Sequence, residues 1–257
     1  MKNIWALYKK EMKSYFTSPV AYVIIFIFLV IAGFFFFSMI FSFSKVTSEY
    51  MNYPEYMDYL NLGEWVIRPL FGNLSVILLF MLPILTMRLI AEEKRSGTLK
   101  LLLSYPIRDI EVLFSKFLAA ETVLFIMFFL TFPIPVFLFA YGQPEWGLIL
   151  TNYLGMILLT GAFVSLGLFA SSVTERQVVA ALITFGSLII IWVINWAKDL
   201  AGFTVGAILD DISLLSHIEN FTKGVIVTHD IVYYVLFSSF FLFLALTALQ
   251  SRTWRSK

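Results

Sequence analysis

The sequence predicts an all-α polytopic membrane protein, and two observations carry this prediction. Hydrophobic residues make up 60% of the 257 residues and charged residues only 14%, well beyond the apolar content of a soluble globular domain. The apolar residues also gather into six stretches, each long enough to cross a hydrocarbon core about 30 Å thick as a helix. With no internal repeat or soluble domain visible, residues 1–257 are predicted to form a single transmembrane domain.

The chain begins with a predicted interfacial helix and two spans. Residues 1–17 place apolar and aromatic side chains among four lysines, a pattern that favours a helix lying along the membrane surface. The first span is predicted at 20–44. An acidic, tyrosine-rich connection at 45–64 leads to the second span at 66–90, in which Pro83 is expected to introduce a kink.

Four further spans follow a charged segment. They are predicted at 117–141, where two prolines bend the outer half, at 148–171, where three glycines allow close helix packing, at 178–196 and at 232–249. The stretch 200–230 between the last two is amphipathic, but it is too short and too charged to cross. It is predicted to form re-entrant or amphipathic helices that enter and leave the outer face.

The charged segment at 92–108, EEKRSGTLKLLLSYPIR, separates the second and third spans. Its six charged residues exclude it from hydrocarbon, while its four leucines form a small apolar face. These features predict a short helix that docks onto a soluble partner. The alternative is a solvated loop in which the leucines are incidental.

The distribution of basic residues predicts the orientation. Four lysines precede the first span, six Lys or Arg lie from Arg88 to Lys116, Arg176 joins the fourth and fifth spans, and three follow the last span. Together these are 14 of the 18 basic residues, so the positive-inside rule places this side in the cytoplasm. Six crossings then put both termini there, as in a protein of a bacterial-type cytoplasmic (inner) membrane.

The segment and its flanks resemble the type-2 (ABC-2) permease subunits of ABC transporters. The resemblance rests on an acidic pair, a basic residue, Gly-Thr, leucines, a proline and a downstream lysine, and on a second patch, HIENFTKGV, at 217–225. The residues of the first pattern are Glu92, Glu93, Lys94, Gly97, Thr98, Leu101, Leu102, Pro106 and Lys116. The chain is most similar to the branch of gliding-motility-associated permeases and of the permease for nitrous oxide reductase maturation.

The resemblance implies partners and roles. It implies a dimer with an identical or related permease, bound to two cytoplasmic ABC ATPase subunits that carry ATP and Mg²⁺. Residues 92–106 would form the coupling helix that sits in a groove of the ATPase, with 1–17 as a second contact. The re-entrant helices would lie at 210–225 and supply the outer gate candidates His217, Phe221 and Gly224. Substrate would pass between the two protomers.

Several kinds of chemistry find no support in the residues. No phosphate-binding GxxxxGK[ST] loop occurs, so the chain is not expected to hydrolyse ATP or to hold a cofactor. There are no cysteines, and His217 and His229 are interpreted as lone histidines rather than metal ligands. No catalytic residue is assigned, and no basic stripe indicates nucleic acid.

One intramembrane carboxylate remains to be explained. Glu121 lies within the third span, where an unpaired charge is costly, and Arg88 near the end of the second span is the expected ion-pair partner. A direct role in binding substrate or protons and simple exposure at the interface are the alternatives.

The function predicted from these features is that of the membrane-spanning subunit of an ATP-driven exporter, surrounded by lipid. The alternative is an ATPase-driven mechanical or scaffold subunit, which would act on an envelope protein without moving a small substrate. A membrane enzyme is the weakest reading, because no nucleophile and base are paired in the spans.

Overall fold

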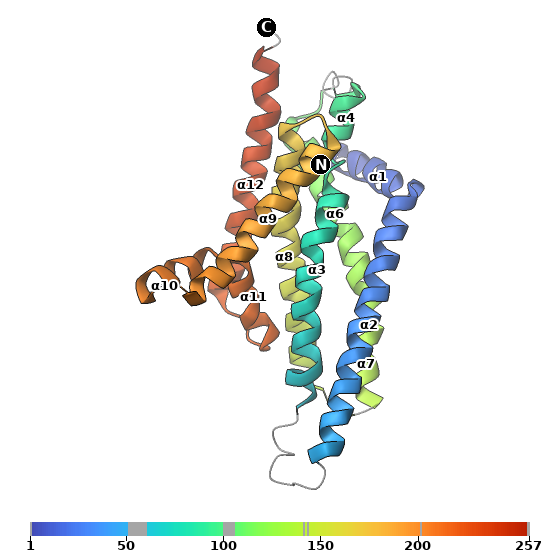
Figure 1. The fold of residues 1–257 in the computed structure, drawn as a ribbon. Helices are drawn as coiled ribbons and strands as arrows, with labels where there is room; N and C mark the ends of the chain where they lie inside the picture. The colour runs from blue at the N-terminus through green and yellow to red at the C-terminus, as the bar shows by residue number, and fades with distance from the viewer. Residues whose placement is uncertain are drawn as a thin grey trace.

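The computed structural model describes residues 2–50, 61–99, 106–140, 142, 144–200 and 202–255, and no strand occurs among them. Figure 1 shows long helices running roughly side by side, with shorter ones across their ends and flank. The elements are α1 (Lys2–Thr17), α2 (Pro19–Tyr50), a π-helical turn (Gly63–Ile67), α3 (Arg68–Thr86), α4 (Ala91–Arg95), α6 (Asp109–Thr131), α7 (Pro133–Phe137), a 3₁₀ turn (Leu138–Ala140), α8 (Trp146–Val173), α9 (Gln177–Leu200), α10 (Phe203–Ile212), α11 (Leu214–Thr222) and α12 (Thr228–Arg255).

Six helical segments are long and apolar enough to cross a membrane, which confirms the predicted all-α architecture with six spans. They are longer than the predicted stretches: the first covers Pro19–Tyr50 and the third Asp109–Ala140. Pro83 lies inside α3, and its carbonyl accepts a hydrogen bond from the Met87 amide at 3.0 Å. Pro133 begins a new helix, α7, where its missing N–H costs no hydrogen bond.

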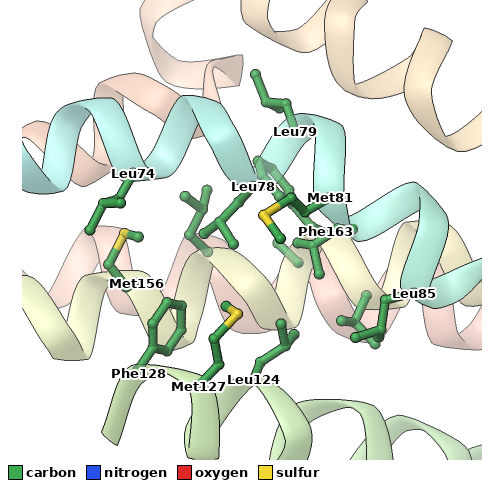
Figure 2. Close-up of a cluster of buried hydrophobic side chains, with 14 of the residues drawn as sticks. Leu74, Leu78, Leu79, Met81, Leu85, Leu124, Met127, Phe128, Met156 and Phe163 are labelled. Carbon is green, nitrogen blue, oxygen red and sulfur yellow. The ribbon is translucent and has the colours of Figure 1, made fainter. Parts of the chain in front are cut away.

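The core lies between α3, α6 and α8, whose leucine, methionine and phenylalanine side chains interdigitate (Figure 2). The methionines at 81, 127 and 156 are at most 9% exposed, so they act as packing side chains in this core. Glycines of α8 permit close approach of its neighbours. At Gly167 a Cβ atom would collide with the side chain of Thr86, so α3 and α8 pack closely at this level.

The spans differ sharply in the share of their surface that is buried by the rest of the chain. In α8, 72% of the most apolar window is buried, whereas in α2 the share is 28% and in α9 and α12 it is 17%. Large apolar side chains project from these faces, among them Phe37 at 77% and Leu182 at 63% exposure. Lipid or a second membrane protein is needed to cover surface of this kind.

Short helices occupy both ends of the bundle. α1 lies crosswise to the start of α2, at the end that also carries α4 and the last turns of α12 (Figure 1). Its Tyr8 hydroxyl donates to Thr122 Oγ1 of α6 at 3.0 Å. On the other half of the molecule, α10 projects sideways from the bundle beside α9 (Figure 1). α11 packs against α8, where a Cβ on Gly155 would come within 2.7 Å of Phe221.

Candidate functional site

Charged side chains from three helices meet at the end of the bundle that carries α4. α3 stops at Thr86, and a turn at 87–90 leads into α4, which brings Glu93 over the end of the core. α1 crosses the same end and supplies Lys10 and Glu11. α6 begins nearby, where Glu111 accepts a hydrogen bond from the Arg108 amide at 3.0 Å, and two turns later it presents Lys116.

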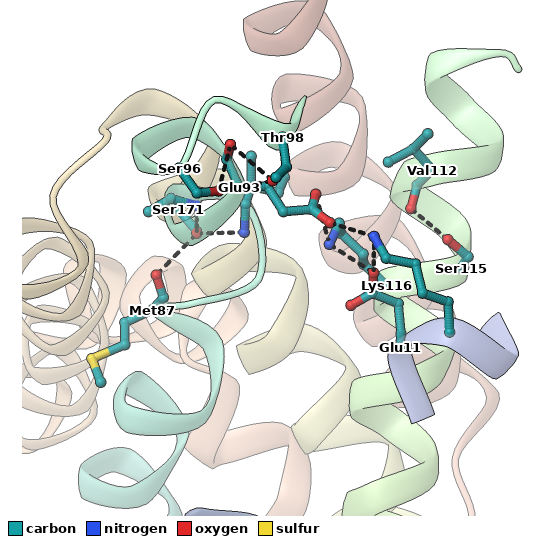
Figure 3. Close-up of polar contacts among 12 residues, drawn as sticks. Glu11, Met87, Glu93, Ser96, Thr98, Val112, Ser115, Lys116 and Ser171 are labelled. Carbon is teal, nitrogen blue, oxygen red and sulfur yellow. Dashed lines mark hydrogen bonds and ion pairs between the residues drawn. The ribbon is translucent and has the colours of Figure 1, made fainter. Parts of the chain in front are cut away.

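These four side chains form one ion-pair network (Figure 3), here called the α1–α4–α6 junction. Lys116 Nζ lies 3.0 Å from Glu11 Oε1 and 3.0 Å from Glu93 Oε2. Lys10 Nζ lies 2.8 Å from Glu93 Oε1 and 3.6 Å from Glu11 Oε1. Two ammonium groups therefore balance two carboxylates, so the network carries no net charge.

Because most of the junction is buried, each of its charges needs an oppositely charged partner within it. The Lys116 side chain is 2% exposed, against 12% for Glu11 and 14% for Glu93, whereas Lys10 reaches solvent at 53%. Burial alone would lower the pKa of Lys10, but the carboxylates of Glu93 and Glu11 outweigh it and raise this pKa. A buried ammonium with two carboxylate partners is held in place, because losing either partner would leave an uncompensated charge.

A cavity of about 360 Å³ adjoins the junction. Besides the four ionic side chains it is lined by Tyr15, Arg88, Glu92 and Thr98, among others. The Tyr15 hydroxyl is buried without a hydrogen-bond partner among the described residues, and its burial, reinforced by the charge of Glu11, raises the pKa of Tyr15. The cavity is polar and roomy enough for water to bridge these groups.

α4 is anchored on its other side to the end of α8. The Ser171 hydroxyl accepts hydrogen bonds from the amides of Ile90 at 3.0 Å and Ala91 at 2.9 Å, and it lies 3.2 Å from the carbonyl of Met87 (Figure 3). Lys94 Nζ donates to the carbonyl of Ser172. Backbone groups freed where α3 ends are thereby satisfied, and α4 is fixed to α8 as well as to α1 and α6.

The residues predicted for coupling fall into two groups. Exposed at this end are Glu92, Gly97, Thr98 and Pro106. Glu93 instead points into the junction and Lys94 toward α8, so Glu92 is the exposed member of the acidic pair. The reason is that Lys116, buried on α6, needs a carboxylate on this side.

The predicted single helix at 92–108 is also divided. α4 ends at Arg95, and Gly97 has φ of +74°, a conformation that stops a helix and suits glycine. Leu99 is 8% exposed and packs inward. Leu101 and Leu102 lie outside the described residues.

The expected pairing of Arg88 with Glu121 is wrong. Arg88 follows α3 in the turn that precedes α4, and its guanidinium lies 3.8 Å from Glu92 Oε2 and donates to Ser18 Oγ at 3.2 Å. Glu121 faces another side of α6, where Thr160 of α8 donates to it at 3.4 Å. Its carboxyl lines a largely apolar groove of about 390 Å³ between α6, α8 and α12, and its Oε1 atom has no hydrogen-bond partner among the described residues.

The outer gate candidates all lie at α11. Phe221, on α11, is fully buried against α8, and Gly224, with φ of +81°, closes the turn that follows α11. His217 is 5% exposed, and its Nδ1 lies 2.7 Å from Asp230 Oδ1. The interpretation of His217 and His229 as lone histidines is therefore wrong, because both rings gather around the carboxylate of Asp230.

Sequence reasoning missed Glu11, Ser171 and Asp230. Glu11 carried a usable signal, since it is the only acidic residue among the lysines of 1–17. Asp230 follows His229 directly and lies in the first turn of α12, where a carboxylate is favoured by the helix dipole. Nothing in the sequence distinguishes Ser171 from the other serines of the spans.

The fold and the junction define a polytopic helical membrane protein in which one charged connection is locked to three helices at one end. The model of the ABC-2 family transporter proteins matches residues 5–250, so the chain belongs to the ABC-2 transporter family. It is the membrane component of an ABC transporter and not the ATPase, and family membership implies ABC ATPase subunits as partners. A search of curated proteins found no match to the chain.

Proposed function

We propose that this chain is the membrane-spanning subunit of an ATP-driven exporter, and that α4 passes the movement of the ATPase to the spans. The observation that carries this proposal is the α1–α4–α6 junction. A charged connection that only linked two spans would not require a fully buried lysine with two carboxylate partners. The end of the bundle that carries α4 would face the cytoplasm of a bacterial-type cell, together with both chain ends.

The two faces of α4 suit such a relay. Its outer face presents Glu92 and Arg95, followed by Ser96 to Thr98, for contact with an ATPase subunit. Its inner face is connected to α3 by the 87–90 turn, to α6 and α1 through Glu93, and to α8 through Ser171. A displacement of α4 therefore acts on several helices together, as a two-state lever requires.

The surface of the spans supports a dimer. α2 and α9 present apolar faces that this chain leaves uncovered, and in this proposal the substrate passes where such faces of two permeases meet. Because the chain has no cysteine, single cysteines placed at Phe34 or Leu182, exposed on α2 and α9, can report the contact directly. Disulfide-linked dimers from these positions are expected, whereas a cysteine at Phe125, exposed on α6, serves as the control.

The coupling role is tested with Glu92→Arg, which reverses an exposed charge on α4. Co-purification with the ATPase and stimulated ATP hydrolysis in vesicles are both expected to fall at least tenfold. Glu145→Arg is the matched control, since Glu145 is an exposed carboxylate just before α8, at the opposite end of the bundle, and should leave both readouts unchanged. A Glu92→Arg variant that still assembles and stimulates hydrolysis like the parent would refute the role of α4 in coupling the ATPase to the spans.

Cargo movement is tested separately with inside-out vesicles of the reconstituted complex. An exporter accumulates its substrate in the lumen when ATP is added, and the substrate stimulates hydrolysis. Hydrolysis stimulated only by an envelope protein, with no flux of any substrate, would contradict export and indicate the mechanical subunit instead.

A further inference from the structure

The corner between α11 and α12 gathers three groups that bind metals, although the sequence places them in two separate stretches. His217 lies on α11, and His229 and Asp230 lie in the first turn of α12. One ligand atom from each falls within 4.8 Å of the others. His217 and Asp230 are 5% and 2% exposed, whereas the His229 side chain is 67% exposed and gives the group an opening to solvent.

Hydrogen bonds fix the remaining atoms of the two buried groups. His217 Nε2 lies 3.2 Å from the carbonyl of Asp211, and a carbonyl only accepts, so Nε2 carries a hydrogen. Asp230 Oδ2 accepts a hydrogen bond from Asn220 at 2.8 Å. The Tyr233 ring stacks on the imidazole of His217 with centroids 3.9 Å apart and sets its orientation.

This arrangement leaves two lone pairs facing each other. With its hydrogen on Nε2, neutral His217 presents a bare Nδ1 to Asp230 Oδ1 at 2.7 Å, and both atoms are acceptors. A positive charge must lie between or beside them, which is either a second proton on the imidazole or a metal ion. The observation that points to the metal is the third donor: His229 Nδ1 is 3.7 Å from the same carboxylate oxygen, so two imidazole nitrogens and one carboxylate oxygen converge on one point. A small movement of Nδ1 and Oδ1 away from each other would make room for one ion among the three atoms.

We propose that His217, His229 and Asp230 bind one divalent transition-metal ion of the Zn²⁺ type, which clamps α11 to the start of α12. Two imidazoles and one carboxylate form a donor set that Zn²⁺ and neighbouring ions prefer, with a fourth position open to water. Histidine ligands of metals characteristically donate their other ring N–H to a carbonyl or carboxylate, as His217 does to Asp211. The inferred site is independent of the α1–α4–α6 junction and of the coupling role.

The composition of the chain simplifies the metal-binding test, because few other side chains can bind Zn²⁺ strongly. His217 and His229 are its only histidines, and it contains no cysteine, so no other imidazole or thiolate competes for the ion. The full chain, purified in detergent with a tag that lacks histidine and then stripped with a chelator, is titrated with ZnCl₂ by calorimetry. One Zn²⁺ per chain is expected, with a higher thermal midpoint, whereas Mg²⁺ should neither bind at this stoichiometry nor stabilise.

His229→Ala is the decisive variant, because its ring is exposed and its loss should not impair folding. It should weaken Zn²⁺ binding at least tenfold and abolish the stabilisation, and Asp230→Asn should do the same. Glu219→Gln removes an exposed carboxylate from α11 and should bind Zn²⁺ like the parent. Absence of stoichiometric binding, or equal binding by His229→Ala, would overturn the proposal.

Nuclear magnetic resonance of the two histidines provides a second readout that does not depend on a variant's folding. With bound Zn²⁺, the Nδ1 resonance of His217 is expected to shift to the range of a metal-bound nitrogen. If both nitrogens of His217 remain protonated at saturating Zn²⁺, the charge between His217 and Asp230 is a proton, and the metal site is wrong.

Discussion

Replacing Lys116 by methionine should loosen the α1–α4–α6 junction without changing the shape of the side chain much. The Lys116 side chain is 2% exposed, and removal of its ammonium group leaves the carboxylates of Glu11 and Glu93, whose side chains are 12% and 14% exposed, facing each other. Breaking a buried ion pair costs about 3–5 kcal/mol. Because both carboxylates keep some contact with water and Lys10 remains 2.8 Å from Glu93, a loss of about 2–3 kcal/mol is expected.

A loss of this size corresponds to a fall of roughly 5–10 °C in the thermal midpoint for a chain of this length. The midpoint can be followed by tryptophan fluorescence of the purified chain in detergent. Lys13→Met is the matched control, since Lys13 is an exposed lysine of α1 outside the network, and its effect should stay below about 0.5 kcal/mol.

A double-mutant cycle separates the ion pair from other effects of the substitution. Glu93→Gln in the Lys116→Met background should cost less than Glu93→Gln alone, with a coupling of about 1–3 kcal/mol. Equal midpoints for Lys116→Met and Lys13→Met, or additive costs in the cycle, would refute the view that the buried pair holds the junction together.

Three further substitutions probe the surroundings. Ser171→Ala removes the acceptor of two amides at the start of α4 and should cost about 2 kcal/mol in the free energy of unfolding. It should also lower stimulated ATP hydrolysis, and hydrolysis at the parental level would contradict an anchoring role for Ser171. Gly167→Ala forces a methyl group against Thr86 and should cost about 1–3 kcal/mol, whereas Gly186→Ala, with open space around it, should not lower the midpoint. Glu121→Met replaces a carboxyl that has one unpartnered buried oxygen, so the midpoint should hold or rise, and a clear fall would mean that the carboxyl has a stabilising partner.

The six spans could be predicted from the sequence because a lipid environment restricts both the composition and the backbone structure of a segment that crosses it. A segment that crosses hydrocarbon must be apolar and must satisfy its own backbone hydrogen bonds, so hydropathy and length identify it. The predicted ends were less accurate, since helices such as α2 and α12 continue into polar residues beyond the apolar stretch. Hydropathy does not report where a helix stops once it has left the hydrocarbon.

The partners of the charged side chains could not be predicted in the same way. Lys116 meets Glu11 across 105 positions of the sequence, and nothing in the spacing of either helix indicates that the two faces meet. The expected pair of Arg88 and Glu121 is wrong for the same reason. The sequence identifies both charged residues near the membrane, but the rotation of α6 about its axis turns Glu121 toward α8. Which faces of two helices meet depends on packing against all their neighbours.

The arrangement of the junction also bears on how coupling and stability are related. An ATPase that pushes on α4 through exposed residues such as Glu92 would act on a helix whose inner side is held by a neutral set of four charges, three of which are largely buried. Shifting α4 relative to α6 would separate Lys116 from Glu93, at a cost of several kcal/mol. Moving α4, α6 and α1 together would keep the pairs intact. The low-energy motion is therefore a joint displacement of these helices, and a covalent cross-link between α1 and α6 should leave ATP-driven activity largely intact. Loss of that activity on cross-linking α1 to α6 would refute the joint displacement.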